Sequence, residues 1–131
     1  MAAILRAITT DEFCEQQLLD FSRRMRLVVL EAPVPGYSFR VKDLFKSSLG
    51  KATALDHHIN RPGNMANDIA SALDRFFLSN SGVSKDILIW GEQHDRYEKE
   101  ILDDYGDARR MAKVNGVSVA PARYSHLKAQ L

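Results

Sequence analysis

One segment of the chain carries an apolar stripe at helical spacing. From residue 65 onward, large or small apolar side chains recur every three or four positions: Met65, Ile69, Ala72, Leu73, Phe76 and Phe77. Such spacing places them on one side of an α-helix, while Asn60 and Pro62 upstream suit a cap and a first helical turn. The pattern therefore predicts a helix over residues 62–79 whose apolar side is buried.

The bulk composition limits the classes of protein to consider. A chain of 131 residues suits a single domain, and its 18 basic and 17 acidic residues give a net charge of only +1. The single cysteine, Cys14, excludes an internal disulfide, and no apolar run approaches the roughly 18 residues of a membrane span. Because the first residues make a poor signal peptide, we expect a cytoplasmic protein without membrane contact.

Capping and turn residues indicate the elements of the first half. Thr9 and Glu12 form a capping box for a first helix whose apolar side runs from Phe13 to Val28. Residues 37–45 indicate an extended entry into a short helix. The polar run 56–63 is expected to be a connection between helices.

The second half is predicted to contain the strands. The apolar run 86–90 lies between two glycines and is typical of a buried strand. Residues 92–104 fit either a helix or a return strand that pairs with this run. An Asn-Gly pair between two valines predicts a β-hairpin at residues 114–117.

Charge is unevenly distributed along the chain. Residues 92–107 hold seven acids against Arg96 and Lys99, whereas residues 109–128 hold five bases and no acid. A basic bias also covers residues 40–61. The basic stretches could contact phosphates and the acidic stretch a basic partner, since local charge can attract a ligand that net charge does not.

A histidine pair offers the strongest candidate metal site. Asp56-His57-His58 followed by Asn67 resembles the first parts of a His-Asn-His nuclease, in which imidazoles hold one divalent metal. The pattern is incomplete, because Phe76 and Phe77 stand where the closing histidine is expected. The simpler interpretation makes His57 and His58 polar loop residues, and we assign no metal ligand, catalytic residue or cofactor.

A longer order of motifs spans residues 37–101. Phe39-Arg-Val-Lys-Asp-Leu-Phe45 is followed by Arg61 and Gly63 at the start of the helix, and later by Arg96-Tyr-Glu-Lys99. This order resembles a group of short bacterial and phage domains whose layout is similar to a winged helix. The resemblance implies that helix 62–79 takes the place of a recognition helix.

The same resemblance implies a set of nucleic-acid contacts. Asparagine and arginine can bind the edges of adenine and guanine, and basic groups near the end of the chain can bind phosphates. Asp68 and Asp74 on the same helix would repel phosphates. The candidate residues are Arg61, Asn64, Asn67, Arg75, Arg109, Arg110 and Lys113.

These observations predict a helix-rich single domain of the α+β class, with a winged-helix-like core and a small antiparallel hairpin. Residues 1–36 would form an N-terminal helix and linker, residues 37–105 the core, and residues 106–131 a basic extension. The first hypothesis is a non-enzymatic DNA-binding regulator of bacterial or phage origin. The alternatives are a protein-interaction or inhibitor module that uses the acidic surface, and the metal-dependent nuclease. The sequence is compatible with a homodimer.

Overall fold

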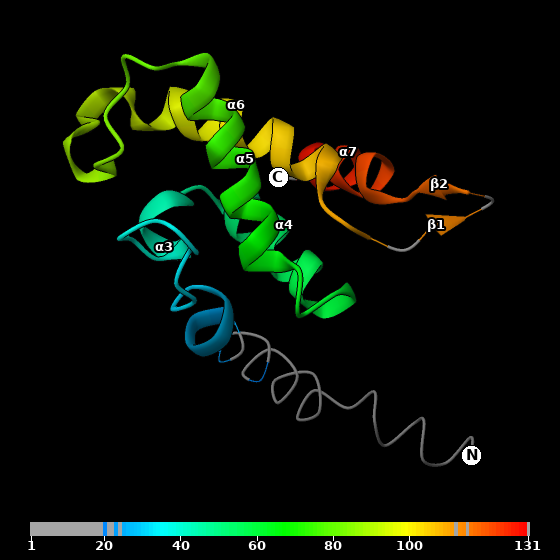
Figure 1. Ribbon diagram of the computed structural model, residues 1–131. Helices are drawn as coiled ribbons and strands as arrows, with labels where there is room; N and C mark the ends of the chain where they lie inside the picture. Colours follow the sequence, from blue (N-terminus) through cyan, green and yellow to red (C-terminus); the bar gives the residue numbers. More distant parts are fainter. Residues whose placement is uncertain (1–19, 21–22, 24, 112, 115, 131) are drawn as a thin grey trace, which may run out of the picture.

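The computed structural model describes residues 20, 23, 25–111, 113–114 and 116–130, and its main elements are helices (Figure 1). The first element with defined bounds is a π-helical turn, η1. In chain order the elements are η1 (Met25–Val29), α3 (Val41–Leu44), α4 (Ser48–Asn60), α5 (Met65–Ser79), η2 (Ile87–Ile89), η3 (Gly91–Gln93), α6 (His94–Ala108), β1 (Lys113–Val114), β2 (Val117–Ser118) and α7 (Ala120–Gln130).

Helix α5 forms the centre of the core. Its apolar stripe is buried, as the spacing predicts, and Ile69, Ala72 and Leu73 have no exposed surface. The stripe packs against α6, whose buried side carries Ile101, Leu102 and other residues at helical spacing. Helix α7 then packs across α6 and α4, and α4 also contacts both α5 and α6.

The prediction of an α+β fold with a winged-helix-like core is wrong. The structure is mostly helical, and the segment after α5, which should supply a two-stranded wing, forms two short 3-10 turns and helix α6. This also settles the ambiguous residues 92–104, nearly all of which are helical.

The run 86–90 is the turn η2 and not a strand. Only Ile87 and Trp90 of this run are buried, whereas Leu88 and Ile89 are exposed. Burial at positions three apart suits a 3-10 turn, and the Asp86 carboxylate accepts a hydrogen bond from the Leu88 N–H at 3.2 Å. Among the residues that the structure describes, no segment pairs with this run as a strand.

The polar run 56–63 was expected to be a connection, but its first half belongs to α4. The Ser47 hydroxyl caps this helix by accepting the Gly50 N–H at 3.0 Å. Gly50, Thr53, Ala54 and His57 follow at helical spacing and are all buried. His57 and His58 therefore lie in the last turns of a helix.

The N-terminal helix predicted from Thr9 lies mainly outside the described residues. At its expected end, Val29 is fully buried while Val28 is 43% exposed, so the apolar stripe does not continue through Val28 as predicted. The π-helical turn η1 shifts which side chains face the core.

The Asn-Gly hairpin is present but very small. Val114 pairs with Val117 in antiparallel register, and Gly116 takes a φ of +80°, which favours glycine. Each strand has two residues, so this pair adds no sheet layer to the architecture. Across the part of the chain that the structure describes, no helix has the length and apolar character needed to cross a membrane.

Candidate functional site

A buried polar junction joins the end of α4 to α5 and α6. His57 has no exposed surface; its Nδ1 lies 2.7 Å from the Tyr105 hydroxyl and its Nε2 lies 2.9 Å from the Arg110 carbonyl oxygen. Because a carbonyl only accepts, Nε2 carries the proton and Nδ1 accepts from Tyr105. Burial lowers the pKa of His57 and raises that of Tyr105, which matches a neutral imidazole and a protonated phenol.

Arg109 belongs to the core of this junction. Its side chain is fully buried, with Nε donating to the Gly106 carbonyl at 3.1 Å and Nη1 to the Thr53 carbonyl at 2.8 Å. Nη2 lies 3.2 Å from the Asp56 carboxylate. The structure thus places the guanidinium group of Arg109, which was predicted to contact phosphate, in the protein interior and not at the surface.

Asp56 is shared between two arginines. In addition to its ion pair with Arg109, the Asp56 carboxylate accepts hydrogen bonds from Arg123 of α7. Burial acts to raise the pKa of Asp56, but the bond from Arg123 and the charge of Arg109 outweigh it, so the pKa is lowered. The carboxylate is thus ionised and ties α4, α6 and α7 together.

Arg110, the next residue, faces outward. Asp68 of α5 accepts its backbone N–H at 2.7 Å and its side-chain Nε at 2.8 Å, and Nη2 lies 2.8 Å from the same carboxylate. The Arg110 side chain is 61% exposed, whereas that of Asp68 is 11% exposed. Asp68 was expected to repel phosphates from the surface; instead it holds an exposed guanidinium group in place.

Arg75 and Arg110 meet at a surface hollow of about 370 Å³, formed by α5 and the end of α6. Arg75 is also fixed by a carboxylate, since its Nε donates to Asp104 at 2.8 Å. These bonds use Arg75 Nε and Arg110 Nε and Nη2. Among the described residues, no hydrogen bond occupies the Nη groups of Arg75 or Nη1 of Arg110. The hollow is lined by Asp68, Ser71, Arg75, Ala108 and Arg110.

The other predicted contacts lie outside this hollow. Asn67 is exposed and adjoins it, since its carbonyl accepts the Ser71 hydroxyl at 3.1 Å. Arg61, which ends α4, and Lys113 in β1 are exposed but do not line it. Asn64 precedes α5 and is half-buried. The structure thus brings together Arg75 and Arg110 out of the seven candidates.

The geometry gives no support to the nuclease alternative. Both ring nitrogens of His57 bond to the protein, so this residue cannot bind a metal in the observed arrangement. Within the described ranges, no three His, Cys, Asp or Glu side chains lie close enough to hold a metal ion.

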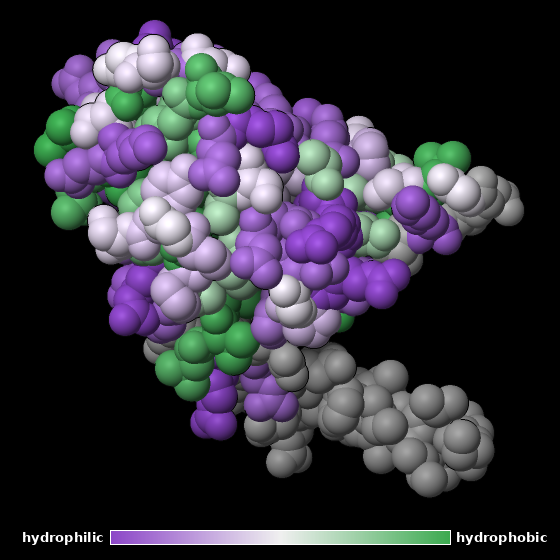
Figure 2. Space-filling model, in the orientation of Figure 1, coloured by the Kyte–Doolittle hydropathy of each residue, from purple (hydrophilic) through white to green (hydrophobic). Residues whose placement is uncertain are grey.

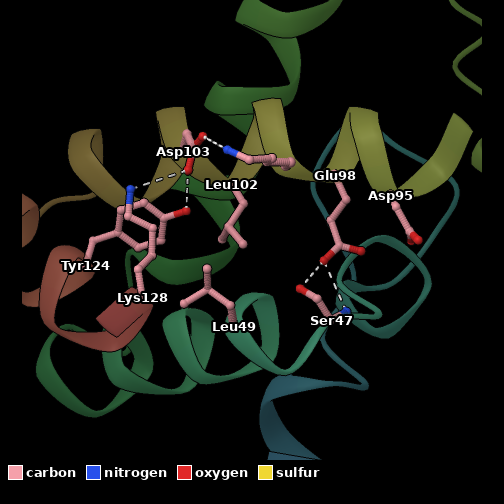
Figure 3. A pocket seen from close by; sticks show the side chains of 9 residues that line it. Ser47, Leu49, Asp95, Glu98, Leu102, Asp103, Tyr124 and Lys128 are labelled. Atoms are coloured by element: carbon pink, nitrogen blue, oxygen red, sulfur yellow. Dashed lines mark hydrogen bonds and ion pairs between the residues drawn. The ribbon is translucent and has the colours of Figure 1, made fainter. Parts of the chain in front are cut away.

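A second recess, of about 250 Å³, lies between α4, α6 and α7 (Figure 3). Leu49 and Leu102 approach each other at its centre, and the ring of Tyr124 closes one side. Charged residues surround this apolar floor: Asp95, Glu98, Lys99, Asp103 and Lys128.

Most polar groups of this recess bond to one another. Glu98 is buried and accepts the N–H groups of Lys46 at 2.9 Å and Ser47 at 3.1 Å, at the start of α4. Asp103 accepts the Tyr124 hydroxyl at 2.6 Å and Lys99 Nζ at 3.0 Å. Burial acts to raise the pKa of Asp103, but these two hydrogen bonds and the nearby lysine charges outweigh it, so the pKa is lowered. The Ser47 hydroxyl also donates to the Glu98 carboxylate, and it accepts the Gly50 N–H as the cap of α4.

The acidic segment 92–107 is partly neutralised within the molecule. Glu98 accepts the N–H and the hydroxyl of Ser47, Asp103 pairs with Lys99, and Asp104 pairs with Arg75. A basic partner would therefore meet fewer free carboxylates than the sequence indicates.

Sequence reasoning missed the buried junction. Tyr105 and Asp68 gave no separate signal, because each lies among residues of ordinary helical pattern. His57 did give one: its position seven residues after Gly50 and three after Ala54 places it on the apolar side of α4.

Comparison of the chain with protein-family models, curated proteins and solved structures gave no match.

Proposed function

We propose that the protein is a non-enzymatic DNA-binding protein that holds backbone phosphates at the hollow between Arg75 and Arg110. The observation that carries this proposal is the convergence of two arginines, 35 positions apart in sequence, on one exposed hollow of about 370 Å³. It does not depend on the winged-helix layout, which the structure lacks.

The fixed orientation of the two guanidinium groups supports phosphate binding. Asp104 holds Arg75 through Nε, and Asp68 holds Arg110 through Nε and Nη2. Arginine binds phosphate through paired N–H groups, and side chains held in advance lose less entropy on binding. The free Nη groups can therefore donate to one phosphate oxygen each.

Arg61 and Lys113 add positive charge to the surface outside this hollow. Both are exposed, and Lys113 lies three residues after Arg110. Four phosphate contacts would make binding strongly dependent on salt, with a slope of about −0.9 in log K against log salt for each phosphate. From 50 to 200 mM salt, affinity should then fall by about 100-fold.

Titration of a labelled DNA duplex, followed by fluorescence anisotropy at several salt concentrations, tests the proposal. Arg75→Ala and Arg110→Ala should each weaken binding for all sequences alike and reduce the slope by about 0.9.

Arg96→Ala is a matched control. Arg96 is exposed near the other end of α6 and lies over the ring of Tyr97, away from the hollow. The Arg96→Ala variant should bind DNA as the wild type does, apart from a small loss of affinity caused by the lower net charge. Absence of binding at low salt and micromolar protein would refute the proposed function.

A further inference from the structure

The backbone of Arg110 is held on both sides by groups of the protein interior. Its N–H donates to the Asp68 carboxylate at 2.7 Å, and its carbonyl oxygen lies 2.9 Å from His57 Nε2. His57 has no exposed surface, and its Nε2 also lies 3.5 Å from the Asp68 carboxylate. That carboxylate in turn holds the Arg110 guanidinium group. His57 therefore lies against both Arg110 and the carboxylate that orients it.

The two bonds of the His57 ring require a neutral imidazole. Nδ1 accepts from the Tyr105 hydroxyl at 2.7 Å, while Nε2 donates to the Arg110 carbonyl. A second proton would turn Nδ1 into a donor that faces the O–H of Tyr105. Among the described residues, the Tyr105 hydroxyl has no other hydrogen-bond partner to which it could turn. Protonation of the ring therefore conflicts with the bond at Nδ1.

Charged groups on or beside four helices surround this imidazole. Asp68 of α5 favours a second proton, whereas Arg109 and Arg110 beyond α6 oppose it. On α4 itself, Asp56 is already paired with Arg109 and with Arg123 of α7. Burial has the largest effect and lowers the pKa of the imidazole, so the ring is neutral at pH 7.5.

A charged ring would compete with Arg110 for Asp68. The charge favours the carboxylate over a carbonyl as the acceptor for Nε2–H, because a charge-assisted bond is the stronger one. Arg110 would then lose the donor to its carbonyl and part of its hold on Asp68. The surface between α5 and the hairpin β1–β2, where the chain leaves α6, is mainly hydrophilic (Figure 2), so a released Arg110 side chain would move into water.

We propose that His57 is a positioning residue for DNA binding, and that a second proton on its ring releases Arg110 from the hollow. This inference rests on the proposed function and adds its regulation by acid. A proton also brings positive charge, which by itself would attract phosphates and raise affinity. The sign of the pH effect therefore separates positioning from simple attraction.

Anisotropy titrations of the labelled duplex between pH 7.5 and pH 5.5, at one low salt concentration, test the proposal. Circular dichroism at each pH shows that the fold is retained. We expect wild-type affinity to fall by at least about fivefold, the lower end of the usual coupling between two sites. The slope should not exceed about one in log affinity per pH unit, as for a single proton.

Two arginine variants distinguish loss of positioning from general unfolding, and neither alters His57. Arg75→Ala keeps Arg110 and its contacts, so its weaker binding should fall with acid as the wild type does. Arg110→Ala removes the side chain that His57 positions, so its remaining binding should hardly change with pH. Acid unfolding would instead reduce binding by both variants alike.

Histidine variants identify the group that titrates. His57→Gln should bind more weakly at pH 7.5 but lose no affinity in acid, because an amide offers a donor and an acceptor and does not titrate. His57→Leu offers neither and should bind more weakly than His57→Gln. His126→Gln is the control for a surface histidine, since His126 is exposed on α7 and does not line the hollow. It should show the wild-type fall.

Three results would overturn the proposal. These are an affinity that stays constant or rises towards acid, a fall that persists in Arg110→Ala, and a fall that is unchanged in His57→Gln. Absence of duplex binding at pH 7.5 would refute the proposed function itself. Binding at pH 7.5 without the expected pH profile would remove this inference and leave the proposed function intact.

Discussion

Two neighbouring arginines at the end of α6 have opposite environments. Arg109 is fully buried, and burial lowers its pKa, although Asp56 partly offsets this. Arg110 is exposed and lies on the α5 surface. The same charge therefore contributes to stability at one position and is available to a ligand at the next.

This difference predicts separate effects of truncation. Arg109→Ala removes bonds to two buried carbonyls and one partner of Asp56, so it should lower the free energy of unfolding by about 3–5 kcal/mol. Arg110→Ala should lower it by about 1 kcal/mol, because most of that side chain is in water. Urea unfolding of both variants measures this. Equal losses would contradict the buried role of Arg109.

The buried His57 predicts a loss of stability in mild acid. Its pKa is lowered in the folded state, so below the usual value of 6.5 the unfolded chain binds a proton that the folded protein does not. The free energy of unfolding should therefore fall as the pH drops from 7 through 6.5 towards 5. Asp56, whose pKa is lowered from 3.8, adds its loss only below about pH 4.

His57→Gln isolates the contribution of the imidazole. This variant should be less stable at pH 7 but should lose less stability between pH 7 and pH 5 than the wild type. Urea unfolding across this range measures both slopes. Parallel curves for the two proteins would show that His57 does not titrate on unfolding.

At the scale of elements, α6 and α7 meet at a glycine. A Cβ atom added at Gly106 would lie 2.5 Å from ring carbons of Tyr124. That ring is fixed, because its hydroxyl donates to Asp103 at 2.6 Å. Gly106 therefore permits the close approach of the two helices.

Gly106→Ala should separate these helices and lower the free energy of unfolding by about 1–3 kcal/mol, despite the better helix propensity of alanine. Gly82→Ala is the control, since nothing lies within 4 Å of its added Cβ; it should change stability by less than about 0.5 kcal/mol. Chemical denaturation of both variants measures these changes in the free energy of unfolding. A neutral Gly106→Ala would contradict the close packing.

The elements also show what the sequence could predict. The stripe of α5 was recognised because six apolar residues share one period, and no other structure buries them all. The run 86–90 was mistaken for a strand because local composition cannot reveal whether a pairing partner exists. The hollow was missed because Arg75 and Arg110 come together only through the packing of α5 on α6. Asp68 was misjudged for the same reason.

At the scale of the molecule, one polar junction connects the interior to the proposed binding surface. His57 of α4 bonds to Tyr105 of α6 and to the carbonyl of Arg110, whose N–H bonds to Asp68 of α5. Figure 1 shows the turn η2 and the hairpin β1–β2 at opposite sides of the molecule, with α6 running between them. The hollow lies where α5 meets the end of α6, so a ligand bound there contacts elements that the junction joins to the rest of the fold. Binding and folding should therefore be linked.

This linkage predicts that a DNA duplex stabilises the whole fold. At a free duplex concentration of about 100 times the dissociation constant, the free energy of unfolding should rise by about 2.7 kcal/mol, because the duplex binds the folded form. Higher salt should reduce this gain at the same duplex concentration, since affinity falls. Arg75→Ala with Arg110→Ala should show a much smaller gain at that concentration. Urea unfolding with and without duplex measures each value. An equal gain in the double variant would place duplex binding away from the hollow, and the two arginines would not be the phosphate contacts.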